Sequence, residues 1–348
     1  MRKLKNHFFI EEREVGLASC PLLVAEIACA HHGDFERAQR LIDAATDAGA
    51  DVVQLQIFRA SHQLAPGHSM RSLLETIEFS DEEWASLCDR VKKNGKMLSV
   101  FVYDLPSLEL ALTLDPALLK LSSSDLSHER MLCACGKSKK PILLSTGGSR
   151  MSEVESALQV LEENGANEVV LMHGVQNFPT PLEDARIQRI QALSYFFDLP
   201  VGFQDHTDAS TPEAADTDLL ALGAGACVLE KHLTLSRAEK LTDYQAAMEP
   251  EEWKVYAARI RSVAPAMNDR NIVGLNEADL QYRQFQKKYA HAVRPLRKGE
   301  HLSEDALVYL RAESGTGLSE IEIKRFLDRP LHQNIPQGEL LLEKHFDG

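Results

Sequence analysis

The feature that most constrains the fold is a regular alternation of short apolar runs with helical patterns between about residues 22 and 263. Short apolar runs bounded by turn signals are typical of buried parallel strands. We expect strands at residues 22–28, 52–58, 97–102, 118–122, 141–145, 168–173, 200–204 and 226–231. Helices are expected at residues 34–48, 81–94, 152–163 and 250–263, the first three each followed by an Asn or Gly helix stop.

These elements amount to about eight strand–helix units in about 240 residues, which matches an α/β fold of the (β/α)8 (TIM) barrel type. The competing topology is a doubly wound sheet. That sheet would normally have fewer strands and a Gly-rich first turn, which the sequence lacks. We therefore predict a TIM-barrel domain over residues 1–264.

The pattern changes after residue 264. Residues 265–288 are polar and weakly periodic, which predicts a linker. Residues 289–348 then predict a small separate domain, with strand-like pieces at 290–293, 307–309 and 340–343 and a Gly-containing loop at 313–317. A domain of about 60 residues is marginally stable alone, so we expect it to dock on another part of the protein.

Composition excludes several classes of partner. The 348 residues carry a formal net charge of -14, which argues against binding to nucleic acid or an anionic membrane. No run approaches 18 apolar residues, and the N-terminus has no signal-like apolar segment. The six cysteines are scattered and lie mostly in apolar runs, as expected of buried thiols. These observations predict a soluble, cytoplasmic protein.

Two histidines end strand-like runs, His206 in residues 201–207 and His232 in residues 227–234. The carboxyl ends of parallel strands share one rim of a barrel, so the two imidazoles can meet there. Two neutral imidazoles with carboxylates nearby suit a divalent metal that keeps positions open for substrate. The alternative is two unrelated histidines, one in a loop and one at the end of a core strand.

Other polar residues also follow the predicted strands. The set comprises Glu26, Gln54, Gln56, Lys120, Ser122–Asp125, Ser145–Gly148, His173, Asp205, Glu230 and Lys231. A lysine, a serine cluster and a Ser-Thr-Gly-Gly turn together favour a phosphate or carboxylate site. The alternatives are a salt bridge from Lys120 to a neighbouring strand, a buried ion pair of Glu26 with Lys120 or Lys231, and serines that cap the helix after residue 127.

Six segments carry a resemblance to a known family: residues 24–34, 48–56, 144–147, 178–181, 199–207 and 230–234. They resemble the N-acetylneuraminate (sialic acid) synthase family, which includes the spore-coat polysaccharide biosynthesis protein E branch. The tail resembles that family's antifreeze-like (SAF) domain. The resemblance implies a domain-swapped homodimer and a divalent metal, manganese or magnesium. It also implies condensation of phosphoenolpyruvate with an N-acylated amino sugar to a nine-carbon 2-keto acid and phosphate, in polysaccharide biosynthesis.

The resemblance assigns roles to individual positions. It implies that His206 and His232 are metal ligands and that Glu26 is a carboxylate near the reacting centre. The positions that would hold phosphoenolpyruvate are Lys120, Ser123 and Ser145. The positions that would contact the sugar are Asp125, Asp243 and, from the small domain into the partner subunit, Arg311.

Several positions depart from the family pattern. Gln54 replaces a lysine, Phe101 a threonine and Gln204 a serine around the phosphate, while Gln176 and Phe178 replace an asparagine and a tyrosine of the sugar pocket. Each lost charge-assisted bond weakens phosphate binding by about 1.5–3 kcal/mol unless another group compensates. Arg59 is the candidate to restore the charge. The departures leave two alternatives open, a metal-dependent aldolase or lyase on the same barrel and a non-catalytic homologue.

Overall fold

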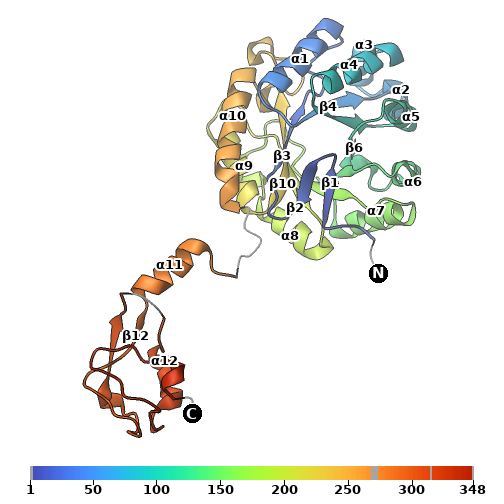
Figure 1. Cartoon of the computed structure of the whole chain (residues 1–348). Helices are drawn as coiled ribbons and strands as arrows, with labels where there is room; N and C mark the ends of the chain where they lie inside the picture. Colours follow the sequence, from blue (N-terminus) through green and yellow to red (C-terminus); the bar gives the residue numbers. More distant parts are fainter. Residues whose placement is uncertain (1–2, 268–272, 314–315, 347–348) are drawn as a thin grey trace. The chain divides into compact units, whose positions relative to one another are not determined.

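The computed structural model describes residues 3–267, 273–313 and 316–346. The chain divides into two compact units, Met1–Arg270 and Asn271–Gly348 (Figure 1). No helix within the described ranges is both long and apolar enough to cross a membrane.

The first unit is a closed parallel barrel. Its eight strands are β3 (Leu22–Glu26), β4 (Val52–Ile57), β5 (Met97–Val102), β6 (Leu118–Leu121), β7 (Ile142–Ser145), β8 (Val169–His173), β9 (Val201–Asp205) and β10 (Ala226–Leu233). Strands that follow one another in sequence pair in parallel, and β10 pairs with both β9 and β3, which closes the barrel. The short strand β11 (Ala247–Met248) extends the sheet beside β10. The predicted (β/α)8 barrel is confirmed.

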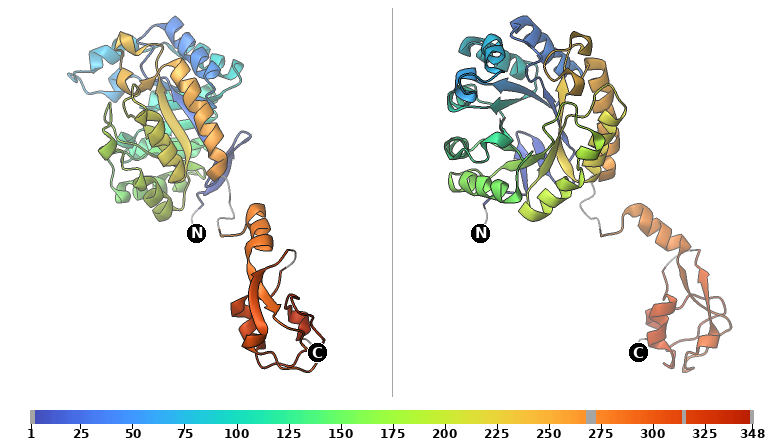
Figure 2. Two further views of the ribbon diagram at one scale, coloured as in Figure 1. Left: turned by 90° about the vertical axis from the view of Figure 1, so that its left-hand side faces the viewer. Right: turned by 180° about the vertical axis from the view of Figure 1, so that it is seen from behind.

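Helices surround the barrel on its outer side (Figures 1 and 2). They are α1 (Phe35–Asp47), α4 (Asp81–Lys93), α5 (Leu105–Thr113), α6 (Glu129–Ser138), α7 (Met151–Glu163), α8 (Gln188–Phe197), α9 (Glu213–Gly223) and α10 (Pro250–Val263). Two short helices, α2 (Ala60–Gln63) and α3 (Arg71–Ile77), lie between β4 and α4. Local signals set the helix starts: the Asp34 carboxylate accepts the Arg37 N–H at 2.9 Å, and Ser80 forms a capping box with Glu83.

Side chains alternate between the inside and the outside of the barrel along each strand. Outward residues such as Leu23, Val53 and Leu119 join the large core beneath the helices. Inward residues near the strand starts, such as Leu22 and Val52, form a separate apolar core inside the barrel. Further along the strands the inward positions become polar, and this change places the site at the carboxyl end.

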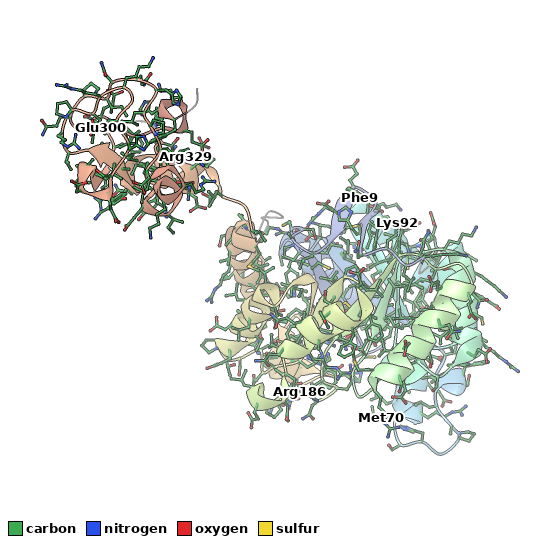
Figure 3. All side chains as sticks on the ribbon, turned by 90° about the horizontal axis from the view of Figure 1, so that it is seen from below. Phe9, Met70, Lys92, Arg186, Glu300 and Arg329 are labelled. Carbon is green, nitrogen blue, oxygen red and sulfur yellow. The ribbon has the colours of Figure 1, made fainter. Side chains whose placement is uncertain are left out.

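An N-terminal hairpin closes the other end of the barrel. It consists of β1 (His7–Ile10) and β2 (Arg13–Gly16), which pair antiparallel. Its buried residues Phe8, Ile10 and Val15 pack with the inward apolar residues of the barrel strands. Phe9 of this hairpin and Met70, from the segment after β4, lie at opposite ends of the barrel unit (Figure 3). The hairpin therefore covers the amino-terminal end of the barrel. The sequence patterns did not predict this hairpin.

The second unit has its own core around an antiparallel pair of strands, β12 (Lys288–Ala292) and β13 (Leu307–Arg311). The expected strand at 340–343 is absent from this described segment: only a single bridge joins His291 to Leu340, and Glu343–His345 form a 3-10 turn. The short helix α12 (Glu320–Ile323) packs into the same core. Part of the expected 313–317 loop lies outside the described residues.

The stretch expected to be a linker contains a helix, α11 (Glu277–Gln286). Asn276 caps this helix through a capping box with Asp279. None of its residues is buried, so its apolar side chains give no inward-facing stripe by which sequence periodicity could reveal it.

Candidate active site at the carboxyl end of the barrel

A cavity of about 250 Å³ lies where the carboxyl ends of the strands meet. The predicted site residues that line it are Glu26, Lys120, Ser145, Gln176, Phe178, Gln204, His206, His232 and Asp243. The remaining lining residues are Gln56, Phe101, Tyr103, Ser122 and Glu230. Most of the lining residues were thus predicted, some from strand ends and Gln176, Phe178 and Asp243 from the family resemblance.

The charged centre of the cavity is Lys120. Its ammonium forms an ion pair with Glu230, from the opposite side of the barrel, and lies 3.9 Å from Glu26. The same ammonium lies 4.5 Å from the centre of the Phe101 ring, a cation–π contact. The salt bridge foreseen for Lys120 thus crosses the barrel interior instead of joining neighbouring strands. Glu26 is near Lys120 and not Lys231.

Gln54 lies fully buried beneath the cavity and does not line it. Its amide nitrogen donates to Glu26 and, at 3.2 Å, to Glu230, while its carbonyl accepts the Ser99 hydroxyl at 2.8 Å. Burial, with Glu230 adding to it against the opposing effect of Lys120, raises the pKa of Glu26 to about 7. Glu26 can therefore exchange a proton near neutral pH.

The two predicted imidazoles lie side by side, with ring centres 5.3 Å apart. Burial lowers the pKa of His206 and lowers that of His232 well below its ordinary value, so both rings are neutral at pH 7. His206 Nδ1 lies 2.7 Å from the Val175 carbonyl, which can only accept, so Nδ1 carries the proton and Nε2 keeps its lone pair.

The imidazole pair suits a divalent metal, because neutral rings with an anchored Nδ1 are the usual nitrogen ligands. Three carboxylates, Glu26, Glu230 and Asp243, line the same cavity. Within the described residues, however, no three or more His, Cys, Asp or Glu side chains are gathered closely enough to hold a metal by themselves. The two imidazole nitrogens alone are therefore the candidate ligands in this cavity.

Aromatic rings form two walls. Phe101 and Tyr103 stack with ring centres 4.3 Å apart, and Phe178 lies 4.2 Å from the His206 ring. Sequence analysis missed Tyr103 as a site residue. The alternation that points Ser99 and Phe101 inward would have found it one position beyond the predicted strand. Asp243 completes this part of the cavity, and burial raises its pKa.

The expected anion-binding groups are only partly in place. Ser145 lines the cavity and donates its hydroxyl to the Gln204 side-chain carbonyl at 2.9 Å. Gly174 permits this arrangement, since a Cβ there would lie 2.2 Å from Gln204 Cγ. Thr146 instead donates both its N–H and its hydroxyl to the Met172 carbonyl. Of the Ser-Thr-Gly-Gly turn, only the serine faces the cavity.

The serine cluster divides between two places. Ser122 lines the cavity and caps the short 3-10 turn Ser123–Asp125, accepting the Ser124 N–H at 3.3 Å. The alternative that the serine cluster caps the helix after residue 127 is wrong, because α6 begins at Glu129 with His128 at its N-cap. Ser123 is not among the lining residues.

Asp125 lies in an adjoining pocket of about 440 Å³, which shares Tyr103 with the central cavity. One of its carboxylate oxygens is 3.4 Å from His128 Nδ1. Burial raises the pKa of Asp125, an effect that His128 opposes. The predicted sugar-contacting acid is thus beside the cavity and not in it.

Several expected rim residues point elsewhere. Asp205 and Lys231 pair on the outer side of the barrel wall, and His173 Nε2 lies 2.9 Å from the Ala185 carbonyl. Arg59 does not restore the missing charge: its guanidinium forms an ion pair with Asp81 and donates to the Phe79 carbonyl at 3.1 Å. Arg311 is exposed at the end of β13 in the second unit.

Fold and cavity together define a class: a (β/α)8 barrel with a polar acid–base site at the carboxyl ends of its strands, where enzymes of this fold carry their active sites. Residues 41–271 match the model of the NeuB family, and the chain belongs to this family. The family predicted from the sequence motifs is therefore confirmed.

Relatives extend the match over almost the whole chain. The chain is 30% identical to the N,N'-diacetyllegionaminic acid synthase of Campylobacter jejuni, over 92% of this chain and 99% of the relative. The structure of the spore coat polysaccharide biosynthesis protein SpsE from Bacillus subtilis is 26% identical, with a TM-score of 0.66 and coverage of 98% and 99%. The sialic acid synthetase of Leptospira borgpetersenii has a TM-score of 0.74 at 24% identity, over 80% and 96%, and supports the fold.

Proposed function

We propose that the protein is a synthase that condenses phosphoenolpyruvate with an N-acylated amino sugar to give a nine-carbon 2-keto acid and phosphate, in surface or spore-coat polysaccharide biosynthesis. The observation that carries this proposal is the single cavity that gathers Lys120, Ser145, the two imidazoles and three carboxylates. The names of the relatives support it, since the Campylobacter jejuni protein is a synthase of a sugar acid of this type.

In this proposal Lys120 supplies the cation for phosphoenolpyruvate, and Ser145 and the Gln204 amide supply neutral hydrogen bonds. Ser123 and Gln54 do not line the cavity. Ser123 lies beside it, and Gln54 holds Glu26 and Glu230 in place by hydrogen bonds. Because Glu230 already pairs with Lys120, an incoming anion competes with it for the ammonium. Phosphoenolpyruvate binding is therefore expected to be weaker than at a site with two unpaired lysines.

We propose that His206 and His232 would hold a divalent metal, manganese or magnesium. Such an ion would supply the Lewis-acid polarisation of the aldehyde of the open-chain sugar. The enol carbon then forms a bond to the aldehyde carbon, water adds to the adjacent carbon, and the carbon–oxygen bond to phosphate breaks. In this proposal Glu26, with its pKa near 7, and Asp243, with a raised pKa, move the protons of these steps.

The sugar half of the site is proposed to lie between Phe178, Gln176 and the adjoining pocket of Asp125. We further propose that residues 289–348 form an SAF-type domain, joined to the barrel domain of residues 1–264 by the segment 265–288. In a domain-swapped homodimer, Arg311 would complete the sugar site of the partner subunit. The exposure of this guanidinium at a strand end is compatible with such a role.

A second candidate function is a metal-dependent aldolase or lyase. One observation favours it: Lys120 is the only lysine or arginine among the described lining residues, and Glu230 already neutralises it. A donor that carries a carboxylate and no phosphate, such as pyruvate, needs less positive charge.

Scanning fluorimetry tests the proposal through ligand-induced stabilisation. The wild type is heated with Mn²⁺, phosphoenolpyruvate and an N-acetylated amino hexose, singly and together. We expect phosphoenolpyruvate with Mn²⁺ to raise Tm, and Lys120→Met to lose this increase. Lys137→Met, on the exposed face of α6, is the matched control. Stabilisation by pyruvate but not phosphoenolpyruvate would favour the second candidate, and no stabilisation by any ligand would leave the synthase proposal without support.

A further inference from the structure

A buried ion pair lies directly behind the two imidazoles. Asp205 immediately precedes His206 at the end of β9, and Lys231 immediately precedes His232 in β10. Because side chains alternate along a strand, the two imidazoles face the cavity while Asp205 and Lys231 face the helices outside. The pair therefore belongs to the barrel wall, on the side away from any substrate.

The ammonium of Lys231 lies close to three oxygen atoms. It donates to Asp205 and to the Ala214 carbonyl of α9, and its third partner is Asp218 Oδ2, at 2.6 Å. Lys231 is 1% exposed, Asp205 2% and Asp218 0%. Two hydrogen bonds and one close ion pair therefore hold the ammonium in place. Two of the partners, Ala214 and Asp218, belong to α9, which ties this helix to the wall.

The Asp205 carboxylate also binds the residue that follows His206. Thr207, the residue after His206, donates its N–H to Asp205 Oδ1 at 3.1 Å and its hydroxyl to Oδ2 at 2.6 Å. The two residues on either side of His206, Asp205 and Thr207, are thus joined by hydrogen bonds to the Asp205 carboxylate. Its Nδ1 bond to Val175 then fixes the ring itself.

The same ion pair joins facing positions of the two strands. Lys231 lies opposite Asp205, and Glu230 lies opposite Gln204, in the parallel ladder between β9 and β10. A slip of one residue would turn His206 or His232 away from the cavity. Such a slip would also separate Asp205 from Lys231 and leave both charges buried without a partner. The buried ion pair therefore raises the free energy of the shifted register.

We propose that Asp205 and Lys231 are positioning residues that hold His206 and His232 at the spacing needed to bind a divalent cation together. This inference rests on the metal site of the proposed function. It assigns the affinity for the cation partly to residues that touch neither the cation nor the substrate, as groups behind metal ligands commonly do.

Asp218 provides a matched control, since it contacts the same ammonium but neighbours neither histidine. Calorimetric titration with Mn²⁺ alone is combined with urea unfolding for wild type, Asp205→Asn, Lys231→Met and Asp218→Asn. We expect Asp205→Asn and Lys231→Met to weaken Mn²⁺ binding roughly tenfold or more. Asp218→Asn should lower stability yet keep Mn²⁺ affinity within about threefold of wild type, since buried pairs contribute to stability separately from ligand geometry.

Equal losses of Mn²⁺ affinity in Asp218→Asn and Asp205→Asn would overturn the inference. Lys231 and its two carboxylate partners would then affect Mn²⁺ binding only through the stability of the protein. Wild-type affinity in folded Asp205→Asn and Lys231→Met would also overturn it and leave the metal site standing. Thr207→Val keeps the side-chain shape and the ion pair, so it serves if the other variants fail to fold; a several-fold weaker affinity is expected, and an unchanged one would contradict the inference. A wild type that binds no Mn²⁺ would overturn the metal site and the inference together.

Discussion

Lys120 and Glu230 form an ion pair across the interior of the barrel, from strands on opposite sides of it. Both side chains are almost completely buried, and Gln54 donates a hydrogen bond to the same glutamate. Among the described residues, Lys120 is the one lysine that lines the cavity, and Glu230 partly neutralises it before any ligand binds. Under the proposed function, an anionic substrate competes with Glu230 for that ammonium.

Gln54→Lys should tighten phosphoenolpyruvate binding by roughly tenfold, the equivalent of one charge-assisted bond. The new ammonium would lie between Glu26 and Glu230, where the Gln54 amide now lies, and would release Lys120 toward the ligand. Calorimetric titration of phosphoenolpyruvate into both proteins measures the change. Arg59→Ala is the control and should bind as wild type does, because Arg59 pairs with Asp81 outside the cavity. Weaker binding in Gln54→Lys would contradict this account.

His206→Ala and His232→Ala should each abolish the stabilisation of the protein by Mn²⁺. The two neutral rings, with centres 5.3 Å apart, are the proposed nitrogen ligands, and one ring alone should bind the metal only weakly. Scanning fluorimetry at increasing Mn²⁺ concentrations measures this effect. The Tm of each variant should no longer rise with Mn²⁺ concentration. His68→Ala removes an exposed imidazole and should respond like wild type. Full Mn²⁺ stabilisation in both single variants would rule out this pair as the metal site.

The stability of the protein should depend on pH through Glu26. Burial raises the pKa of this carboxyl from 4.5 to about 7, so between these values the folded state binds a proton that the unfolded state does not. The contribution of Glu26 to stability therefore falls as pH rises from about 4.5 to about 7, by up to about 3 kcal/mol, since one pKa unit corresponds to about 1.4 kcal/mol.

Urea unfolding at pH 5 and pH 8 checks this expectation. The stability of wild type relative to Glu26→Gln should be greater at pH 5 and should decline at pH 8, because the glutamine does not titrate. Glu155→Gln, on the exposed face of α7, should show no such change relative to wild type. A difference between wild type and Glu26→Gln that is equal at both pH values would mean that Glu26 is ionised throughout.

Mixing two inactive variants should restore activity if Arg311 acts on the partner subunit. A hybrid of an Arg311→Ala chain with a His206→Ala chain contains one site with an intact histidine pair and an intact arginine, so up to about half of the activity should return in the heterodimer. Tagged chains, co-purified to isolate the hybrid, give the measurement. A purified hybrid without activity would argue against a contribution from the partner subunit.

The barrel could be predicted from sequence because each strand is a separate apolar run and three of the predicted helices end at a clear stop, as at Gly95. No residue range was predicted for helices α6, α8 and α9, and none of them has a side-chain cap at its start. The N-terminal hairpin could not be predicted, since its two four-residue strands are defined only by packing into the barrel. Helix α11 was also missed. All of its side chains are exposed, so none contributes to a buried apolar stripe.

The site was predictable to the extent that strand ends share a rim. Alternation within a strand tells which side a residue faces, and it would have separated Gln204 from Asp205 and found Tyr103. It does not tell depth, so Gln54 was expected in the cavity and lies beneath it. The pairing of Lys120 with Glu230 depends on closure of the barrel, which brings together strands far apart in the sequence.

Release of phosphate tests the central proposal most directly. The protein is incubated with phosphoenolpyruvate, Mn²⁺ and a panel of mono- and diacetylated amino hexoses, while phosphate and the acidic product are quantified by colorimetry and mass spectrometry. The proposed function predicts one phosphate per nine-carbon acid, no phosphate without the sugar, and a rate at least about a hundredfold lower in Lys120→Met, which lacks the cation for the phosphorylated substrate. A nine-carbon product formed from pyruvate without phosphate, or no product from any member of the panel, would contradict it.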